Sequence, residues 1–513
     1  MTNRNYNILF HLHTISGIII SVLLYVIFFA GSFSFFRDEI VNWERNDKVQ
    51  STQALHLNID TALDTIGKTF DLKGRDITFR KYYEEQQIST NITASKDSLV
   101  KNAKLTKFLY LNTKNYTQEN YYSSYSLGEF LYRLHFFAQV PYPYGYYLSG
   151  FTAFFFLFAL ITGILVHWDK IVSNFFLFRP KAKLKTLWTD MHTALGTIGF
   201  PFQFVYAVTG TFFMIKLLIV APNVIAFYNG DQNKLYEALE YNNPTFPYKN
   251  IALNKSFNIN KYVDETSAKW KDFNVTKVDI INYGDANMYV NVEGETAYSS
   301  KYTGIGKITY KVANDSIVAT KKPYTETTYL DGVKNVLYRL HYGDYAGYPL
   351  RIISFIMGII GCLVILSGVL IWLTARDKKH ISEKKRKFNE LLTRIYLAIC
   401  LTMYPITALS FIAVKVIGQG MPFLYKFYFI GWLILTILFV LKKDNNFTNK
   451  YTLLLGSIFG ICIPLVNGFA TGNWFWKSYQ AHAFHLFFVD VFWLALALIT
   501  FFVYLKLVQK KKL

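Results

Sequence analysis

Histidines at the ends of long apolar segments are the residues of this sequence that are best suited to chemistry. Seven of the ten histidines lie there: His13, His167 and His192 at one predicted membrane face, and His135, His341, His482 and His485 at the other. Ionisable side chains at membrane depth are costly and usually mark function, and neutral imidazole is the commonest metal ligand. Haem iron needs only one or two axial protein ligands. The histidines are therefore candidate ligands of b-type haem iron.

An internal repeat arranges four of these histidines in two pairs. The segment 131–135, Leu-Tyr-Arg-Leu-His, recurs as 337–341, and His13-Thr-Ile-Ser-Gly17 matches His192-Thr-Ala-Leu-Gly196. Duplication places His13 opposite His192 near the cytoplasmic face and His135 opposite His341 near the outer face. In His-x-x-x-Gly the glycine lies one turn from the histidine on the same helix face and leaves room for a flat ring. We therefore expect two haems, one in each layer, that form an electron path across the membrane.

Five further residues could take part in the same chemistry. His167, at the end of the second predicted membrane helix, is expected to be a haem ligand or a neighbour of one. His482 and His485 lie three apart at the start of the eighth helix, on one face, where they could add a metal or haem ligand. Arg133 and Arg339 each precede a paired histidine by two residues. They either form bidentate contacts with haem propionates or extend to the membrane interface.

The apolar segments predict an integral membrane protein. The chain has 513 residues, 52% of them hydrophobic, and several apolar runs contain the ~20 residues that a membrane-spanning helix needs. The net charge is +20, but Lys and Arg gather in the short loops 169–191, 376–387 and 442–443 and at 510–512. This is the positive-inside pattern, which places both termini in the cytoplasm and disfavours nucleic-acid binding. The three cysteines lie in apolar runs and form no CxxC, which argues against disulfides, thiolate-bound zinc and c-type haem.

We predict an all-α polytopic membrane bundle with two small α+β domains outside the membrane. The eight predicted helices are 13–36, 147–168, 192–218, 350–374, 391–417, 423–442, 452–471 and 481–506. Residues 1–168 and 169–376 each form two helices around an outer loop, about 38–146 and 219–349, and 377–513 form a C-terminal extension of four helices. Alternating patterns at 107–112 and 287–292 predict strands, and 59–70 and 259–272 predict short helices. Each outer loop is long enough for an α+β domain.

The sequence resembles the PepSY-associated membrane proteins, also called iron-regulated membrane proteins, over about residues 5–376. The matching motifs are His13-Thr-x-x-Gly17, Leu134-His135, Thr162-Gly-Ile-Leu-Val-His167, 175–180, Asp190-Met-His192, 199–202, Leu340-His341 and Ser367-Gly-Val-Leu-Ile-Trp372. The resemblance implies a bacterial inner-membrane protein with PepSY-like periplasmic loops. Some members are ferric-siderophore reductases with b-type haem. By that similarity, electrons pass from a quinol or a cytoplasmic reductant to a ferric siderophore, or another Fe(III) chelate, outside.

One position departs from the family pattern. Members often have histidine in the Pro-Phe-x segment of the third helix, where this chain has Gln203. Glutamine cannot replace imidazole on haem iron. Either this position is not a ligand here, or one haem is lost or is ligated differently, with His167 as the substitute. The C-terminal helices resemble an extension of longer members, and no chemistry follows from their sequence.

Two other functions stay open from the sequence. The first is a non-enzymatic membrane anchor whose outer domains bind or regulate a peptide or peptidase, with structural roles for the histidines. The second is a transporter component for iron chelates, although transporter sites usually lie near the midplane of the bilayer rather than near its faces. No convincing G-x-S-x-G, H-E-x-x-H or G-x-G-x-x-G motif is present, so hydrolase and dinucleotide-binding functions lack support.

Overall fold

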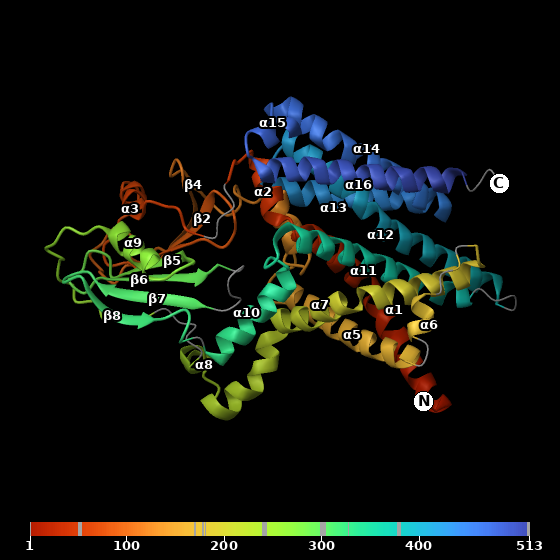
Figure 1. The fold of residues 1–513 in the computed structure, drawn as a ribbon, viewed down its shortest axis with the longest axis horizontal. Helices are drawn as coiled ribbons and strands as arrows, with labels where there is room; N and C mark the ends of the chain where they lie inside the picture. The colour runs from red at the N-terminus through yellow and green to blue at the C-terminus, as the bar shows by residue number, and fades with distance from the viewer. Residues whose placement is uncertain are drawn as a thin grey trace.

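The computed structural model describes residues 2–49, 54–168, 171–176, 179, 181–238, 244–297, 304–326, 328–376 and 381–509. Figure 1 shows a bundle of long helices and, at one end of it, a β-sheet with short helices; we call this end the sheet end. The first helix begins and the last helix ends at the opposite end of the bundle. Lys170, 177–178, 180, 377–379 and 510–512, which carry part of the predicted orientation and motif pattern, lie outside the described residues.

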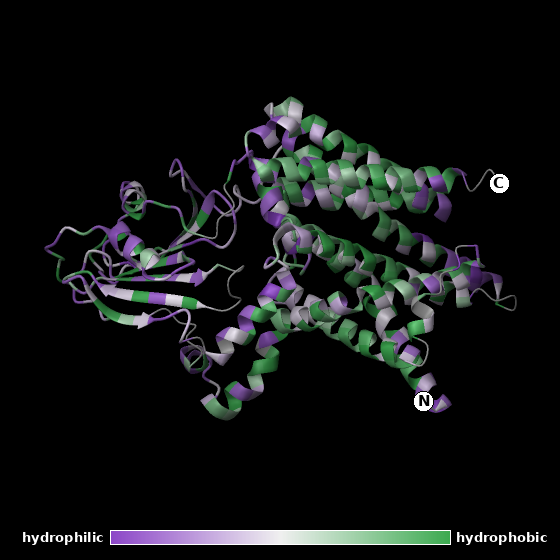
Figure 2. Ribbon diagram, viewed as in Figure 1, coloured by the Kyte–Doolittle hydropathy of each residue, from purple (hydrophilic) through white to green (hydrophobic). Residues whose placement is uncertain are grey.

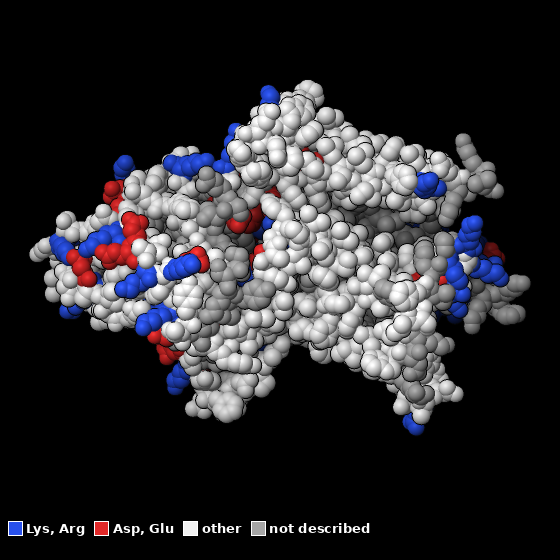
Figure 3. Space-filling view, in the orientation of Figure 1, with Lys and Arg blue, Asp and Glu red and all other residues white. Residues whose placement is uncertain are grey.

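Eight helices in the described part of the chain are long and apolar enough to cross a membrane. They are α1 (Asn3–Ser34), α5 (Tyr144–His167), α7 (Leu184–Tyr228), α11 (Gly347–Arg376), α12 (Glu383–Val416), α13 (Met421–Leu441), α14 (Asn445–Thr471) and α16 (Phe484–Gln509). The eight predicted spans are thereby confirmed. Figure 2 shows that these helices are predominantly apolar, and in Figure 3 Lys and Arg gather at the two ends of the molecule. Lipid requires such an uncharged belt between charged ends.

Four of the long helices form a closed ring. α1 packs against α5, α5 against α7, α7 against α11, and α11 against α1. Glycines permit this packing: a Cβ on Gly361 of α11 would lie 2.5 Å from the Phe28 ring of α1. Small residues let helix backbones approach closely in lipid. α7 has non-helical dihedrals at Ile215, where its membrane-crossing part ends, and continues to Tyr228 at the sheet end.

The other four long helices form the C-terminal bundle (383–509), which lies beside the ring. α14 packs against both α12 and α16, and α13 packs against α12. Contacts of α12 with α1 and α11 join this bundle to the ring.

Eight shorter helices complete the described helical structure. They are α2 (Arg37–Arg45), α3 (Ile59–Gly67), α4 (Leu127–Leu134), α6 (Ile171–Phe175), α8 (Gln232–Ala238), α9 (Ile259–Lys269), α10 (Tyr329–Tyr342) and α15 (Phe475–Gln480). α4 and α10 contain the repeated Leu-Tyr-Arg-Leu segment. A capping box of Thr328 and Asp331 begins α10, and Gly343 ends it with a left-handed φ of 61°. The helices predicted at 59–70 and 259–272 are confirmed as α3 and α9.

The strands of both outer loops form one eight-stranded sheet. They are β1 (Ile77–Arg80), β2 (Gln87–Ile92), β3 (Lys107–Asn112), β4 (Gln118–Glu119), β5 (Phe273–Ile281), β6 (Tyr289–Thr296), β7 (Ile305–Lys311) and β8 (Ser316–Lys321). The order is β4-β3-β2-β1-β5-β6-β7-β8, and β1 pairs antiparallel with β5, with Ile77 opposite Ile280. The strand predicted at 107–112 is confirmed as β3, and that at 287–292 overlaps β6.

The expectation of two separate outer domains is therefore wrong. α3 and α9 contribute Ile59 and Tyr262 to a single apolar core, in which Phe79 of β1 and Val278 of β5 are also buried. Each loop alone would expose the edge of β1 or β5 and half of this core. Pairing the two edges covers both, which small sheets need for stability.

Candidate functional site

The sheet-side pair consists of His135, at the C-cap of α4, and His341, near the end of α10. Their ring centroids are 6.0 Å apart, with 44° between the ring planes. His135 packs on Gly31 of α1, and its Nδ1 donates to the Ile27 carbonyl at 2.8 Å. Nδ1 of His341 lies 2.6 Å from Oγ1 of Thr209 in α7. The structure thus brings together the histidines of the two repeated segments.

The distal pair consists of His13 in α1 and His192 in α7, whose ring centroids are 6.1 Å apart with 70° between the planes. Nδ1 of His13 donates to the Ala159 carbonyl of α5 at 2.8 Å, and Nδ1 of His192 donates to the Val364 carbonyl of α11 at 2.9 Å. Each imidazole is therefore oriented by a hydrogen bond to the next helix of the four-helix ring.

Glycines of those partner helices make room for the distal rings. A Cβ on Gly163 of α5 would lie 3.0 Å from the His13 ring, and a Cβ on Gly368 of α11 would lie 3.0 Å from the His192 ring. The prediction that these histidines begin their helices is wrong, because α1 starts at Asn3 and α7 at Leu184. The helix continues for several residues before each histidine, so the two imidazoles lie inside the four-helix ring rather than at helix ends.

The hydrogen bonds at Nδ1 determine which nitrogen is available for a metal. A carbonyl oxygen only accepts, so Nδ1 of His13, His135 and His192 carries the proton and Nε2 keeps its lone pair. Metal-binding histidines typically donate their other N–H to such a carbonyl, which orients the ring and raises its basicity. Burial and the neighbouring His135 lower the pKa of His341 to about 3, and burial lowers the pKa of His135. Both rings of the sheet-side pair are therefore neutral, the form in which imidazole binds metal.

The ring separations fit one metal ion between two imidazoles. With imidazole–metal bonds of about 2 Å and a ring centre about 1 Å behind its nitrogen, two axial imidazoles have centroids about 6 Å apart. The sheet-side and distal pairs measure 6.0 and 6.1 Å. Among the described residues, no group of three or more His, Cys, Asp or Glu side chains fits a metal ion. A pair of imidazoles is the protein donor set that a cofactor with two axial ligands, such as haem, would need.

A cavity of about 580 Å³ lies beside the sheet-side pair. Apolar residues of α1, α5 and α7 line it together with His135 and His341. Its polar lining includes three arginines and several tyrosines: Arg37, Arg339, Arg351, Tyr83, Tyr132, Tyr342 and Tyr348. The volume is in the range of small-molecule and cofactor sites. The cavity combines apolar walls, which suit a flat ring, with a polar part in which arginines lie beside the carboxylates of Asp38, Glu84 and Asp344.

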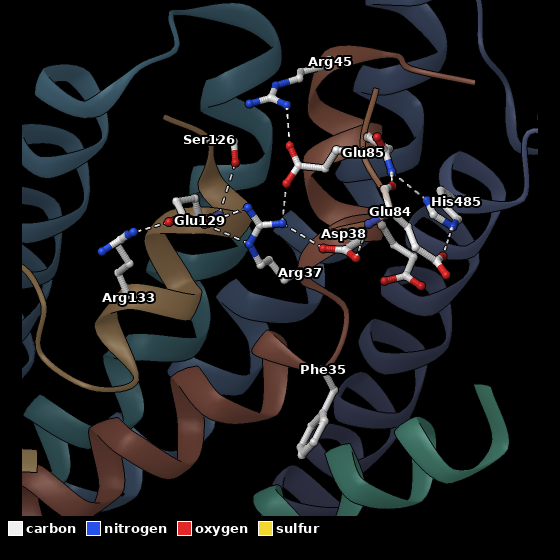
Figure 4. A network of polar contacts seen from close by, with 12 residues as sticks. Phe35, Arg37, Asp38, Arg45, Glu84, Glu85, Ser126, Glu129, Arg133 and His485 are labelled. Atoms are coloured by element: carbon white, nitrogen blue, oxygen red, sulfur yellow. Dashed lines mark hydrogen bonds and ion pairs between the residues drawn. The ribbon is translucent and has the colours of Figure 1, made fainter. Parts of the chain in front are cut away.

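Arg37 lies at the centre of a buried ion network (Figure 4). It donates to Asp38 and to Glu129, each at 2.8 Å, and also to Glu85. Arg45 binds the other oxygen of Glu85 at 2.8 Å. Burial lowers the pKa of Arg37, but Glu85 and Glu129 outweigh this effect and hold the pKa above its usual value. Arg37 is therefore a permanent, fixed cation in the cavity wall.

The two arginines predicted from the repeat take different positions. Arg339 lines the cavity beside His341 and pairs with Asp344. Arg133 is not a lining residue and pairs with Glu129 at 2.5 Å. Arg37 and Arg351, which the sequence analysis missed, line the cavity instead. Their only signal in the sequence was an arginine next to an apolar helix, and such arginines usually extend to the interface.

The three remaining candidate histidines separate into one near the distal pair and two elsewhere. His167, the last residue of α5, is close enough to His13 and His192 to interact with them electrostatically. The prediction that His482 and His485 share a helix face is wrong, because α16 begins at Phe484. His482 is exposed, whereas His485 is 3% exposed and contacts α2.

Gln203 lies on α7 between the levels of the two pairs. It is 1% exposed, and neither of its amide atoms has a hydrogen-bond partner among the described residues. Its nitrogen lies against Gly199 of the same helix. A buried, unpaired amide is costly in an apolar environment.

Comparison with known proteins assigns the chain to a family. No curated protein matches the sequence at a significant level. The family model of the PepSY-associated TM region matches residues 10–375. This span contains both histidine pairs, His167 and almost all of the four-helix ring, and it ends before the C-terminal bundle. The chain therefore belongs to the family of PepSY-associated transmembrane proteins.

Proposed function

We propose that the chain is a b-type haem protein that transfers electrons across the membrane to an extracytoplasmic ferric substrate, a ferric siderophore or a related Fe(III) chelate. The observation that carries this proposal is the geometry of the two histidine pairs. Both have centroids about 6 Å apart, a separation that two imidazoles on one metal ion would have. Three of the four rings donate from Nδ1 to a carbonyl of a neighbouring helix, which leaves Nε2 free for iron.

The distance between the pairs suits transfer across a bilayer. His13 and Gly31, which contacts His135, are separated by 18 residues of α1, or about 27 Å at the rise of an α-helix. The hydrocarbon core is about 30 Å thick. A haem held by each pair supplies one-electron chemistry near each face, and the protein contributes ligation, burial and positioning.

The charge pattern gives this path a direction. We propose that the distal pair lies near the cytoplasm and the sheet end outside, in a bacterial inner membrane, and the basic loops support this orientation. A quinol or a cytoplasmic reductant then delivers electrons to the distal pair. The ferric chelate receives them at the sheet end, next to the cavity lined by His135 and His341. Arg37, Arg339 and Arg351 stabilise carboxylates there, whether of the haem or of an acidic chelate.

Absorption spectroscopy of the purified protein tests the proposal. Oxidised and dithionite-reduced spectra should show low-spin b-type haem at about two haems per chain. His135→Ala or His341→Ala should remove one haem, and His13→Ala or His192→Ala the other. His11→Ala is the matched control, because His11 is exposed on α1 two residues from His13. Haem-free protein from haem-replete cells would exclude the proposal.

A second candidate function is peptide binding by the outer sheet. β8 ends the sheet, and Ile317 and Val318 on it are 51% and 46% exposed. A terminal strand of this kind can pair with an extended peptide. Capture of peptide by haem-free protein, abolished by Val318→Pro, would favour this function over electron transfer.

A further inference from the structure

α2 is a short helix that is buried although most of its residues are polar. It follows α1 at the sheet end, and seven of its nine residues are buried. A buried polar side chain needs a partner, since leaving a donor or acceptor unpaired costs free energy. The partners of α2 come from the ring, from the sheet and from the C-terminal bundle.

Two ionisable residues of the C-terminal bundle bind Trp43 of α2. Nε1 of Trp43 donates to Oδ1 of Asp490 at 2.8 Å, and Asn467 donates to the other oxygen at 3.0 Å. Lys415 lies 4.3 Å from the centre of the Trp43 ring and donates to Asn46 at 2.8 Å. Trp43 and Asp490 are both 0% exposed. An ionisable residue at this depth usually has a specific role.

His485 binds the next polar residue of α2. Asn42 donates one amide hydrogen to Nδ1 of His485 at 2.7 Å and the other to the Glu84 carbonyl at 2.7 Å. Since both hydrogens come from Asn42, Nδ1 accepts, and the proton of His485 is on Nε2. This N–H lies 3.7 Å from the carboxylate of Glu84 (Figure 4). His485 therefore joins α2 to the turn between β1 and β2.

Aromatic packing adds to these polar contacts. The Phe33 and Trp493 rings are stacked at 5.7 Å, and Phe36 lies 4.7 Å from Phe488 of α16. Trp43 lies 5.5 Å from Phe411 of α12. Burial of large aromatic side chains is the main apolar contribution at such a contact.

Other residues of α2 connect it to the sheet-side cavity and to α4. Arg37 lines the cavity, and Glu39 binds Arg351, a second lining residue, at 2.5 Å. Glu44 accepts from the backbone N–H of Leu127 at 2.6 Å. Leu127 is the first residue of α4, which ends at His135. A displacement of α2 would therefore move two of the three cavity arginines, Arg37 and Arg351, and the helix that carries one candidate ligand.

We infer that the C-terminal bundle positions α2, and that Asp490 and His485 are positioning residues for the sheet-side cavity. The bundle lies beyond the family match, which ends at residue 375, yet it supplies the partners of Asn42 and Trp43 inside that match. Without it, the Trp43 N–H loses its acceptor, the Asn42 amide loses one of its two acceptors, and the aromatic contact is exposed. This gives the C-terminal extension a function that does not require haem.

Hydrogen–deuterium exchange of the full chain in lipid nanodiscs tests the inference. Asp490→Leu leaves Trp43 and Asn467 without an acceptor, so exchange in 37–45 and 127–134 should become at least about tenfold faster. Asp490→Asn keeps an acceptor oxygen and should restore near-normal exchange. Ser457→Ala is the matched control, because it removes a 2.9 Å bond to Thr500 within the same bundle, away from α2. His485→Ala is a second variant if Asp490→Leu does not fold.

Two results would overturn the inference. One is unchanged exchange in α2 for both Asp490→Leu and His485→Ala. The other is an equal acceleration in Ser457→Ala, which would indicate general loosening of the bundle. In haem-loaded protein, the reduction equilibrium of the haem assigned by His135→Ala should shift in Asp490→Leu, whereas that of the distal haem should not. This last measurement rests on the proposed function, but the exchange experiment does not, so the two can fail separately.

Discussion

Gly31 of α1 lies directly against His135, and a Cβ on this glycine would be only 2.5 Å from Nδ1 of the histidine. At the matching position of the second half, a Cβ on Gly210 would meet Cβ of Ala153 at 3.4 Å, which is an ordinary contact. His341 instead bonds to the Thr209 side chain. The two halves of the four-helix ring therefore hold their sheet-side histidines differently, although the sequence segments match.

Gly31→Ala should displace His135, because the new methyl group overlaps its ring. The Nδ1 bond to the Ile27 carbonyl would be lost, and overpacking of this kind costs about 1–3 kcal/mol. The thermal unfolding temperature in detergent and the haem content per chain should both decrease. Gly210→Ala should leave both near the wild-type values. Equal effects of the two substitutions would contradict the asymmetry.

Gly17→Ala distinguishes space needed by the chain from space needed by a cofactor. A Cβ on Gly17 meets no atom within 4 Å, so the stability of the haem-free protein should not decrease, and the better helix propensity of Ala can raise it. Gly17 lies one turn from His13 on the same face, where the distal haem is proposed. The substitution should therefore lower the distal haem content selectively. Normal occupancy of both haems would show that the cofactor does not extend over Gly17.

Asp279 joins the two outer loops at the β1–β5 pair. Thr78 of β1 donates to one carboxylate oxygen at 2.7 Å, and Asn291 and Lys277 bind the other at 3.1 and 2.8 Å. Asp279→Leu should destabilise the sheet by about 3 kcal/mol, because it removes the nearer ion pair of the buried Lys277, whose other carboxylate, Glu293, lies 4.0 Å away. Asp279→Asn keeps the hydrogen bond from Thr78 and should cost less. Limited proteolysis and thermal unfolding would rank the variants, and the reverse order would refute this assignment.

Glu44 should make stability depend on pH. Burial raises the pKa of this carboxyl to about 7, against the opposing effects of the Leu127 N–H and Arg45. Between about pH 4 and 7 the folded state holds a proton that the unfolded state releases, so stability falls as pH rises through this range. Below this pH range the stabilisation from protonated Glu44 is complete, and above the range it is lost.

Glu44→Gln should remove this dependence. The free energy of unfolding of wild type should decrease, relative to that of the variant, by at most about 1.4 kcal/mol per pH unit between pH 5 and 7. Denaturation at a series of pH values measures the difference. Glu265→Gln, on the exposed side of α9, should run parallel to wild type. A parallel curve for Glu44→Gln would mean that Glu44 is ionised throughout.

Gln203→Leu should stabilise the haem-free protein. Both amide atoms of Gln203 are buried without partners, and replacing them with apolar groups of similar size removes a penalty of about 1–3 kcal/mol. Thermal unfolding of haem-free wild type and variant measures the gain. If the haem-loaded variant is instead less stable than the haem-loaded wild type, the Gln203 amide forms a hydrogen bond with the bound cofactor or with a water molecule on it.

Local patterns in the sequence were sufficient for most of the elements. Apolar run length determined the eight membrane helices, because a helix in lipid satisfies its own backbone and needs only length and hydrophobicity. The alternation of polar and apolar residues predicted β3, and the helical periodicity of apolar residues predicted α3 and α9. The internal repeat paired His13 with His192 and His135 with His341, since matched segments occupy matched places.

Contacts between distant segments were decided only by the tertiary structure. The single sheet depends on β1 and β5 finding each other's edges across about 200 residues, and no local pattern specifies which edges meet. The same holds for Arg37 and Arg351 in the cavity wall, and for Asp490 and His485 against α2. A side chain's partner depends on which surfaces the packed helices bring together. The sequence therefore determined the helices and the candidate ligands, and only the fold decided which charges surround them.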